Sequence, residues 1–196
     1  KRIRQTLQPV LVILMFHLVV VRPCGVRALA GNTDGGQTTA VRSSLDIPFA
    51  RIEGVDPNLL SLDIYAPASE SEKKHPVMVM IHGGGWRGGD KNTNPQAFLD
   101  KGISVVAVNY RYVQNGEEDK VEPPVKAPLG DAARALQFVR SKAGEWNLDK
   151  KRIGATGGSA GACTSLWLAF HDDLADPDSE DPIARESTRL YCAAVN

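Results

Sequence analysis

The chain has 196 residues, of which 42% are hydrophobic and 23% are charged, a composition that suits one globular domain with a hydrophobic core. Lysine and arginine together number 23, aspartate and glutamate also number 23, and the formal net charge is therefore zero. Because there is no basic surplus to attract a phosphate backbone, we expect no nucleic-acid partner.

Residues 1–30 predict a secretory signal peptide. A basic start precedes an apolar run from Val10 to Val21, and Ala28-Leu29-Ala30 then gives the small-x-small pattern of a cleavage site after Ala30. As a helix this run would rise only about 18 Å, short of the roughly 30 Å hydrocarbon core of a bilayer. We therefore expect an exported protein, periplasmic or extracellular, with no stable membrane span after cleavage.

The next segment, residues 31–44, is rich in Gly, Thr and Ser and predicts a flexible lead. The folded domain is accordingly expected to begin near Leu45. Residues 60–67 alternate apolar and polar side chains, which indicates a half-buried strand that ends at Pro67. We expect it to pair antiparallel with a strand around 49–52.

Two later runs, residues 77–82 and 103–110, are continuously apolar. This pattern is typical of parallel strands that helices bury on both faces. Between them, Asn94 is placed to cap a helix that starts at Pro95, and Gly102 is placed to end it. The segment therefore predicts a strand–helix–strand unit of a parallel sheet.

The remaining elements continue this alternation. Residues 113–128 are polar and Pro-rich and predict a loop, whereas 131–143 have helical apolar spacing. A short strand is expected at 151–157, an apolar helix at 162–170, and the start of another buried strand at 189–196. The fold class predicted is α/β, with a mostly parallel sheet and helices on both faces.

The stretch ATGGSAGA contains the pattern Gly157-x-Ser159-x-Gly161 between a predicted strand and a predicted helix. This pattern is typical of a nucleophile elbow, a sharp turn that holds the serine in a strained conformation while the glycines leave room for it. The amide of Ala160 then lies at a helix N-terminus, where it can stabilise a developing oxyanion.

The stretch HGGGW, from His82 to Trp86, follows the other predicted strand end. Gly83, Gly84 and Gly85 let the backbone turn with its N–H groups facing inward and no Cβ in the way. An oxyanion hole needs such donors about 2.7 to 3.1 Å from the oxygen. The two motifs together, in this order and each at a strand end, are far more specific than either is alone.

The stretches IHGGGW, VNYRY, DAARALQFVR and NLDKKRIGATGGSAG resemble the α/β-hydrolase superfamily. They are most similar to exported carboxylesterases of the hormone-sensitive-lipase-like group and of the feruloyl- and acetylxylan-esterase-like branch, over residues 46–196. The resemblance implies that Ser159 is the nucleophile and that Gly84, Gly85 and Ala160 supply oxyanion amides.

The resemblance also implies structural roles for His82 and Asp131 and a place for Trp86 beside the acyl pocket. The substrate implied is a small or polysaccharide-linked ester. Two alternatives stay open: an amide hydrolase of the kynurenine-formamidase type, and an exported binding protein that has this fold without catalysis.

A serine nucleophile needs a base, and no histidine of the chain is well placed for this role. His17 lies in the signal peptide, His75 precedes a strand at the opposite end of the sheet, and His82 lies in the HGGGW stretch. His171 lies roughly 18 Å along a helix from Ser159, whereas a base must come within about 3 Å.

The order implied by the resemblance is Ser, then Asp or Glu, then His. The polar residues 172–181 are better explained as a loop, so we expect the catalytic acid and the histidine beyond Asn196. The chain, which starts at Lys1 without an initiator methionine, is then expected to be C-terminally truncated, with residues 45–196 forming the N-terminal two-thirds of an α/β-hydrolase domain. We expect this fragment alone to be inactive.

Two other binding sites that the glycines could indicate are not supported by the surrounding residues. Gly83-x-Gly85-x-x-Gly88 formally matches a dinucleotide fingerprint, but Asn109 stands where the acidic ribose ligand should be. In GGWRGGDK an aspartate separates the last glycine from the lysine, which breaks the phosphate-loop pattern. No organic cofactor or metal is therefore expected, and Cys163 and Cys192 are expected to be small core residues rather than a disulfide.

Overall fold

The structure of the protein is a computed structural model, which describes residues 40–68 and 73–196. The predicted signal peptide lies outside the described residues. The elements, in chain order, are β1 (Val41–Pro48), the 3-10 helix η1 (Pro57–Leu60), β2 (Ser61–Pro67), β3 (His75–Ile81), α1 (Gln96–Leu99), β4 (Ser104–Val108), α2 (Val113–Glu118), α3 (Lys126–Ser141), β5 (Leu148–Gly157), α4 (Ala160–Phe170) and β6 (Cys192–Val195).

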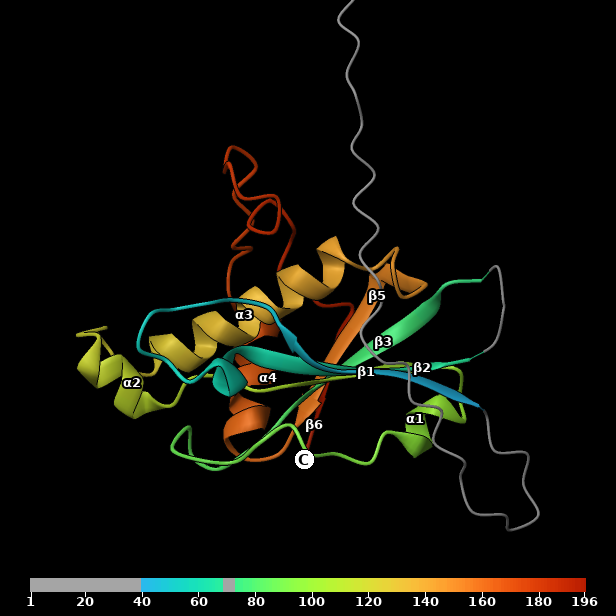
Figure 1. The fold of residues 1–196 in the computed structure, drawn as a ribbon, viewed down its shortest axis with the longest axis horizontal. Coiled ribbons are helices and arrows are strands. Elements are labelled where there is room, and N and C mark those ends of the chain that lie inside the picture. Colours follow the sequence, from blue (N-terminus) through green and yellow to red (C-terminus); the bar gives the residue numbers. More distant parts are fainter. Residues whose placement is uncertain (1–39, 69–72) are drawn as a thin grey trace, which may run out of the picture.

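One mixed sheet holds the six strands in the order β1-β2-β4-β3-β5-β6 (Figure 1). The four strands β4, β3, β5 and β6 run parallel, and β1 and β2 are antiparallel to their neighbours. The carboxyl ends of the parallel strands therefore meet at one edge, together with the amino end of β2. The mostly parallel α/β fold predicted from the sequence is confirmed.

The two faces of the sheet are covered differently. One face presents Val79 and Ile81 of β3 to a core shared with α3 and α4, in which Leu136 and Leu168 are buried. The opposite face presents Met80, which is only half-buried, together with its neighbours on β4 and β5. The short helix α1 lies on this second face, so helices cover both faces, as expected.

The predicted helix between β3 and β4 is present but short. It begins at Gln96, one residue later than predicted, with Pro95 at the N-cap position. The Asn94 side-chain oxygen accepts a hydrogen bond of 3.1 Å from the Gln96 N–H. Gly102 follows it with a φ of 72°, a conformation that glycine adopts without strain.

The N-terminal strand differs from the prediction. β1 begins at Val41, within the expected lead, and the strand expected around 49–52 is absent. An edge strand gains its stability from backbone pairing with β2, so it needs few apolar residues and gives a weak sequence signal. β2 is also buried on both faces rather than half-buried. Leu62 and Ile64 lie in the core on one face, and Asp63 on the other face pairs with Lys91 of the loop after β3.

The segment expected to be a loop at 113–128 contains α2 and the start of α3 instead. Asn115 caps α2, since its side-chain oxygen accepts a hydrogen bond of 2.9 Å from the Tyr112 N–H. Pro128 lies in the first turn of α3, where no backbone N–H is required. Proline content therefore misled the prediction here.

The last strand also differs from the prediction. β6 lies at the sheet edge and most of its residues are exposed, whereas a buried strand was expected. Cys192 on this strand and Cys163 on the outer side of α4 are both exposed and free, so their expected place in the core is wrong. Within the described ranges, no helix combines the length and apolar character that crossing a bilayer demands.

Candidate functional site

Ser159 occupies the corner between β5 and α4, at the carboxyl edge of the sheet. Its φ of 52° and ψ of −121° lie in a region that residues other than glycine rarely adopt. Such a conformation costs on the order of 1–3 kcal/mol and persists only where the surroundings impose it. The side chain is exposed, so the hydroxyl is accessible at the turn.

The glycines on either side of Ser159 let this corner approach β3. A Cβ atom at Gly157 or at Gly161 would collide with the backbone carbonyl oxygen of Ile81, the last residue of β3. Any larger residue would push β5 or α4 away from β3. The pattern Gly-x-Ser-x-Gly thus has a packing reason as well as a conformational one.

Residues 82–91, which follow β3 and are called the glycine loop below, pass directly beside the serine. A Cβ at Gly83 would lie 3.0 Å from the Gly158 carbonyl oxygen and 3.5 Å from the Ser159 Cβ. Gly84 has a φ of 96° and packs against the Gly88 carbonyl. The structure therefore brings together the two motifs that the sequence suggested, although they lie far apart in the chain.

The amides of this corner face no protein acceptor. Within the described residues, the N–H groups of Gly84, Gly85 and Ala160 donate no hydrogen bond to another group. Ala160 is also the first residue of α4, whose dipole favours negative charge there. An oxygen with developing negative charge beside Ser159 would find unpaired donors, which is the chemical requirement of an oxyanion hole.

Tyr110 holds the start of the glycine loop. Its hydroxyl donates hydrogen bonds of 2.8 Å to the His82 carbonyl and 3.1 Å to the Gly83 carbonyl. Its ring stacks on the His82 imidazole at a centroid distance of 4.1 Å. Nothing in the sequence pattern marks this tyrosine for such a role, although its position just after β4 places it at the same sheet edge.

His82 is part of the loop's internal structure. Its Nδ1–H donates a 2.8 Å hydrogen bond to the Gly83 carbonyl, and burial lowers the pKa of the imidazole below its usual value. The ring is therefore neutral at neutral pH. Its Nε2 is buried and has no partner within the described residues.

Trp86 links the glycine loop to α4. Its indole Nε1–H donates a 2.9 Å hydrogen bond to the Thr164 hydroxyl, which itself donates to the Ala160 carbonyl over 2.8 Å. On the other side, the Trp86 carbonyl accepts a 2.8 Å hydrogen bond from the Val113 N–H. Trp86 also has a positive φ of 56°. It is therefore strained like Ser159, and the two residues lie in neighbouring segments, the glycine loop and the β5–α4 corner. The role of Thr164 was not apparent from the sequence.

Asp131 lies outside the serine corner. Its buried carboxylate accepts two 2.9 Å hydrogen bonds from the Arg111 guanidinium and a third, also 2.9 Å, from the Arg111 backbone N–H. This carboxylate and its hydrogen bonds raise the pKa of Arg111. Asp131 thus ties α3 to the segment after β4.

The other described histidines lie elsewhere. His75 begins β3, at the end of the sheet opposite Ser159, and its Nδ1 is 3.2 Å from the Gly102 carbonyl. His171 ends α4, where its ring contacts Trp167. In residues 40–68 and 73–196 the Ser159 hydroxyl has no hydrogen-bond partner, and no group of three or more His, Cys, Asp or Glu side chains is arranged to hold a metal.

A cleft of about 540 Å³ adjoins the corner on the face of the sheet that carries α1. Its lining includes His82 and Gly83 from the glycine loop and Gly157 and Gly158 from the serine corner. Lys91 also lines it, although the sequence analysis gave this residue no role. The cleft ends beside Ser159, whose side chain does not itself line it.

A family model described as BD-FAE matches residues 62–193, a range that runs from β2 into the start of β6 and includes both glycine motifs. Juvenile hormone esterase of Tribolium castaneum is 32% identical over 138 residues, which are 63% of this chain and 23% of that protein. Fumonisin B1 esterase of Sphingopyxis macrogoltabida is 29% identical over 167 residues, 79% of this chain and 31% of that protein. The chain thus spans less than a third of these curated relatives.

Solved structures give the same fold. An acetyl ester-xyloside bifunctional hydrolase from Caldicellulosiruptor lactoaceticus superposes with a TM-score of 0.60 at 30% identity, covering 76% of this chain and 55% of that one. A truncated carbohydrate esterase from gut microbiota gives a TM-score of 0.62 at 21% identity, covering 81% and 57% respectively. Together with the family match, these similarities show that the chain belongs to the BD-FAE family and has the α/β-hydrolase fold.

Proposed function

We propose that the protein is a serine carboxylic-ester hydrolase. The observation that carries this proposal is the strained Ser159 beside a glycine loop, with unpaired amides on both segments. In the reaction, the Ser159 hydroxyl oxygen attacks the ester carbonyl and its proton passes to a base. The alcohol leaves with a proton, and water then hydrolyses the acyl-enzyme to release the acid.

The oxyanion of the tetrahedral intermediate would be bound by the amides of Gly84, Gly85 and Ala160. Removal of one such donor typically costs roughly two to three powers of ten in rate. The neutral His82 supports this role, because its hydrogen bond to the Gly83 carbonyl helps to hold the loop. Trp86, in the same loop, is proposed to border the acyl pocket.

The base is proposed to be a histidine, with a carboxylate partner, from the part of the protein that follows Asn196. The chain order implied by the resemblance places both after the serine. Juvenile hormone esterase, which this chain matches over 23% of its length, is a much longer protein.

The proposed substrate is a small acyl ester, free or linked to a polysaccharide. Two similar proteins carry names that support this class: the acetyl ester-xyloside bifunctional hydrolase at 30% identity and endo-1,4-beta-xylanase B of Butyrivibrio fibrisolvens, also at 30%. We further propose that the protein is exported, a proposal that depends on the signal pattern of residues 1–30 alone.

Covalent labelling of the full-length protein with a fluorophosphonate tests the proposal, because this probe phosphonylates an activated serine. We expect one labelled peptide that contains Ser159, loss of the label in Ser159→Ala, and retention in the control Ser141→Ala on α3. Turnover of p-nitrophenyl acetate should be lost in the same variant. Turnover of N-formylkynurenine without ester turnover would indicate the amide-hydrolase alternative, and a wild-type protein that takes no label would favour the binding protein.

A further inference from the structure

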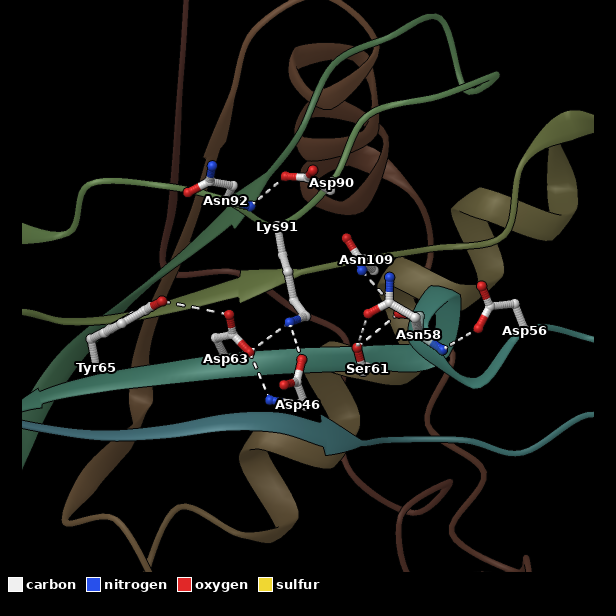
Figure 2. A network of polar contacts seen from close by, with 10 residues as sticks. All are labelled: Asp46, Asp56, Asn58, Ser61, Asp63, Tyr65, Asp90, Lys91, Asn92 and Asn109. Carbon is white, nitrogen blue, oxygen red and sulfur yellow. Dashed lines mark hydrogen bonds and ion pairs between the residues drawn. The ribbon is translucent and has the colours of Figure 1, made fainter. Parts of the chain in front are cut away.

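Lys91, at the far end of the glycine loop, has its ammonium group between two carboxylates. Its Nζ lies 2.8 Å from Asp63 Oδ1 and 2.6 Å from Asp46 Oδ1. Figure 2 shows the side chain extending from the loop to Asp63 on β2 and Asp46 on β1. Three segments that are distant in sequence therefore meet at one charge cluster.

The pair between Lys91 and Asp63 is largely shielded from water, since each side chain is only 10% exposed. Burial alone would lower the pKa of Lys91, but the hydrogen bonds and charges of Asp46 and Asp63 outweigh it and raise this pKa. The ammonium therefore stays charged at neutral pH. A shielded ion pair of this kind has a fixed geometry, because movement of either charge would leave the other unpaired.

The backbone of β1 is shaped to complete the cluster. A register shift between Ser44 and Ile47 places Asp46 at a positive φ of 54°, and the Asp46 N–H donates a 2.8 Å hydrogen bond to Asp63 Oδ1. Asp63 thus accepts from a backbone amide and from the lysine at once. The Asp46 side chain is 74% exposed, so it contributes less than Asp63 to the anchoring.

The segment just before Lys91 packs back on the start of the loop. A Cβ at Gly89 would lie 2.5 Å from His82 Nδ1 and 2.9 Å from the Gly83 carbonyl oxygen, and Gly84 packs against the Gly88 carbonyl. The Gly89 carbonyl also accepts a 2.7 Å hydrogen bond from the Tyr112 hydroxyl. Displacement of residues 88–91 would therefore shift the backbone that carries the candidate oxyanion amides.

We propose that Lys91 is a positioning residue, whose ion pair with Asp63 fixes residues 88–91 and thereby holds the amides of Gly84 and Gly85 beside Ser159. This inference rests on the proposed function and extends it. Lys91 does not touch the reacting atoms in this proposal; it acts through the packing of Gly88 and Gly89 on the start of the loop.

The test uses the full-length protein with the double substitution Lys91→Met and Asp63→Asn. Both charges are removed together so that no unpaired charge is left in the interior, which would confuse positioning with misfolding. Donors that stabilise only the transition state affect kcat rather than KM. We expect kcat for p-nitrophenyl acetate to fall roughly tenfold to a hundredfold, as a misplacement of the order of 1 Å does, while KM changes little.

Two single variants and one exchange measurement complete the design. Lys101→Met replaces an exposed lysine in the turn after α1 and should leave kcat unchanged, and Asp46→Asn should have a smaller effect than the double variant. In the double variant, amide hydrogen exchange should become faster in peptides covering 82–93 and should be unchanged in β5 and α4. This last measurement does not depend on catalysis.

The outcomes separate the two proposals. A wild-type protein without esterase turnover or labelling refutes the proposed function, and the exchange measurement then still decides whether Lys91 fixes the loop. An active wild type whose double variant keeps its kcat and its loop exchange refutes the positioning role alone. Faster exchange throughout the domain refutes it too, because Lys91 would then act on overall stability.

Discussion

Gly161→Ala is the substitution for which the structure makes the sharpest prediction. The added methyl group would collide with the Ile81 carbonyl oxygen and lie 2.9 Å from the His82 carbonyl oxygen. These atoms belong to the backbone at the end of β3 and the start of the glycine loop, so no side-chain rotation can relieve the contact. Either α4 must move outward or β3 must bend.

The magnitude follows from two opposing effects. Alanine in place of glycine in a helix gains at most about 0.5–1 kcal/mol, whereas an additional methyl group in packed structure costs roughly 1–3 kcal/mol. Because the obstacle is rigid, we expect the upper part of that cost and a net loss of about 2 kcal/mol. For a domain of this size that loss lowers the Tm by about 4–8 °C.

Gly130→Ala is the matched control, because it makes the same change in another helix. A Cβ at Gly130 would have no heavy atom within 4 Å, and the residue lies on the exposed side of α3. This variant should melt at or above the wild-type temperature. Thermal melts followed by circular dichroism measure both, and Gly161→Ala should also lose most of its fluorophosphonate labelling. Equal melting of the two variants would show that α4 does not pack on β3 as described.

Two further predictions concern stability. Asp131→Asn removes the buried carboxylate charge that pairs with Arg111 and should destabilise the domain by about 3 kcal/mol. Asp119 meets the same guanidinium with a side chain that is 41% exposed, so Asp119→Asn should cost less than about 1 kcal/mol. Urea unfolding measures both losses, and equal losses would contradict the stronger role of Asp131. Partial burial raises the pKa of Asp173, but hydrogen bonds, first among them that from Ser187, lower it overall to about 2. Its contribution to stability should therefore be complete above its unfolded pKa of about 3.9 and be lost as the pH falls through the folded pKa of about 2. The difference in urea midpoint between wild type and Asp173→Asn should accordingly shrink below about pH 4. A difference near pH 2 as large as that at neutral pH would contradict this prediction.

The sequence predicted those features that depend on local pattern. The apolar run that becomes β4 is buried throughout, and that of β3 is buried on one face and half-buried on the other. The glycines at 83–85 and 157–161 mark backbone that must turn sharply after a strand. In a parallel sheet, strands that end at the same edge bring their following loops together. The proximity of the two motifs could therefore be expected before the structure was available.

The features that were missed depend on contacts between distant segments. Asp63 is the single charged residue of β2, and its partner Lys91 lies 28 positions away in a loop. Tyr110 likewise becomes meaningful only when its hydroxyl is found on the carbonyls of His82 and Gly83. No periodicity marks such pairs, because each residue taken alone fits an ordinary strand end or a polar loop.

The described part of the chain holds the components of the site that depend most on backbone geometry. A side-chain base can reach a nucleophile from several directions, but amide donors are fixed by the path of the main chain and cannot be adjusted by rotamers. Here Tyr110 holds the start of the glycine loop, Trp86 ties its middle to α4 through Thr164, and Lys91 anchors its end to β2. Each attachment joins the loop to a different element of the domain. The candidate oxyanion amides are thus held by the sheet and α4 together, independently of any contact to the Ser159 hydroxyl.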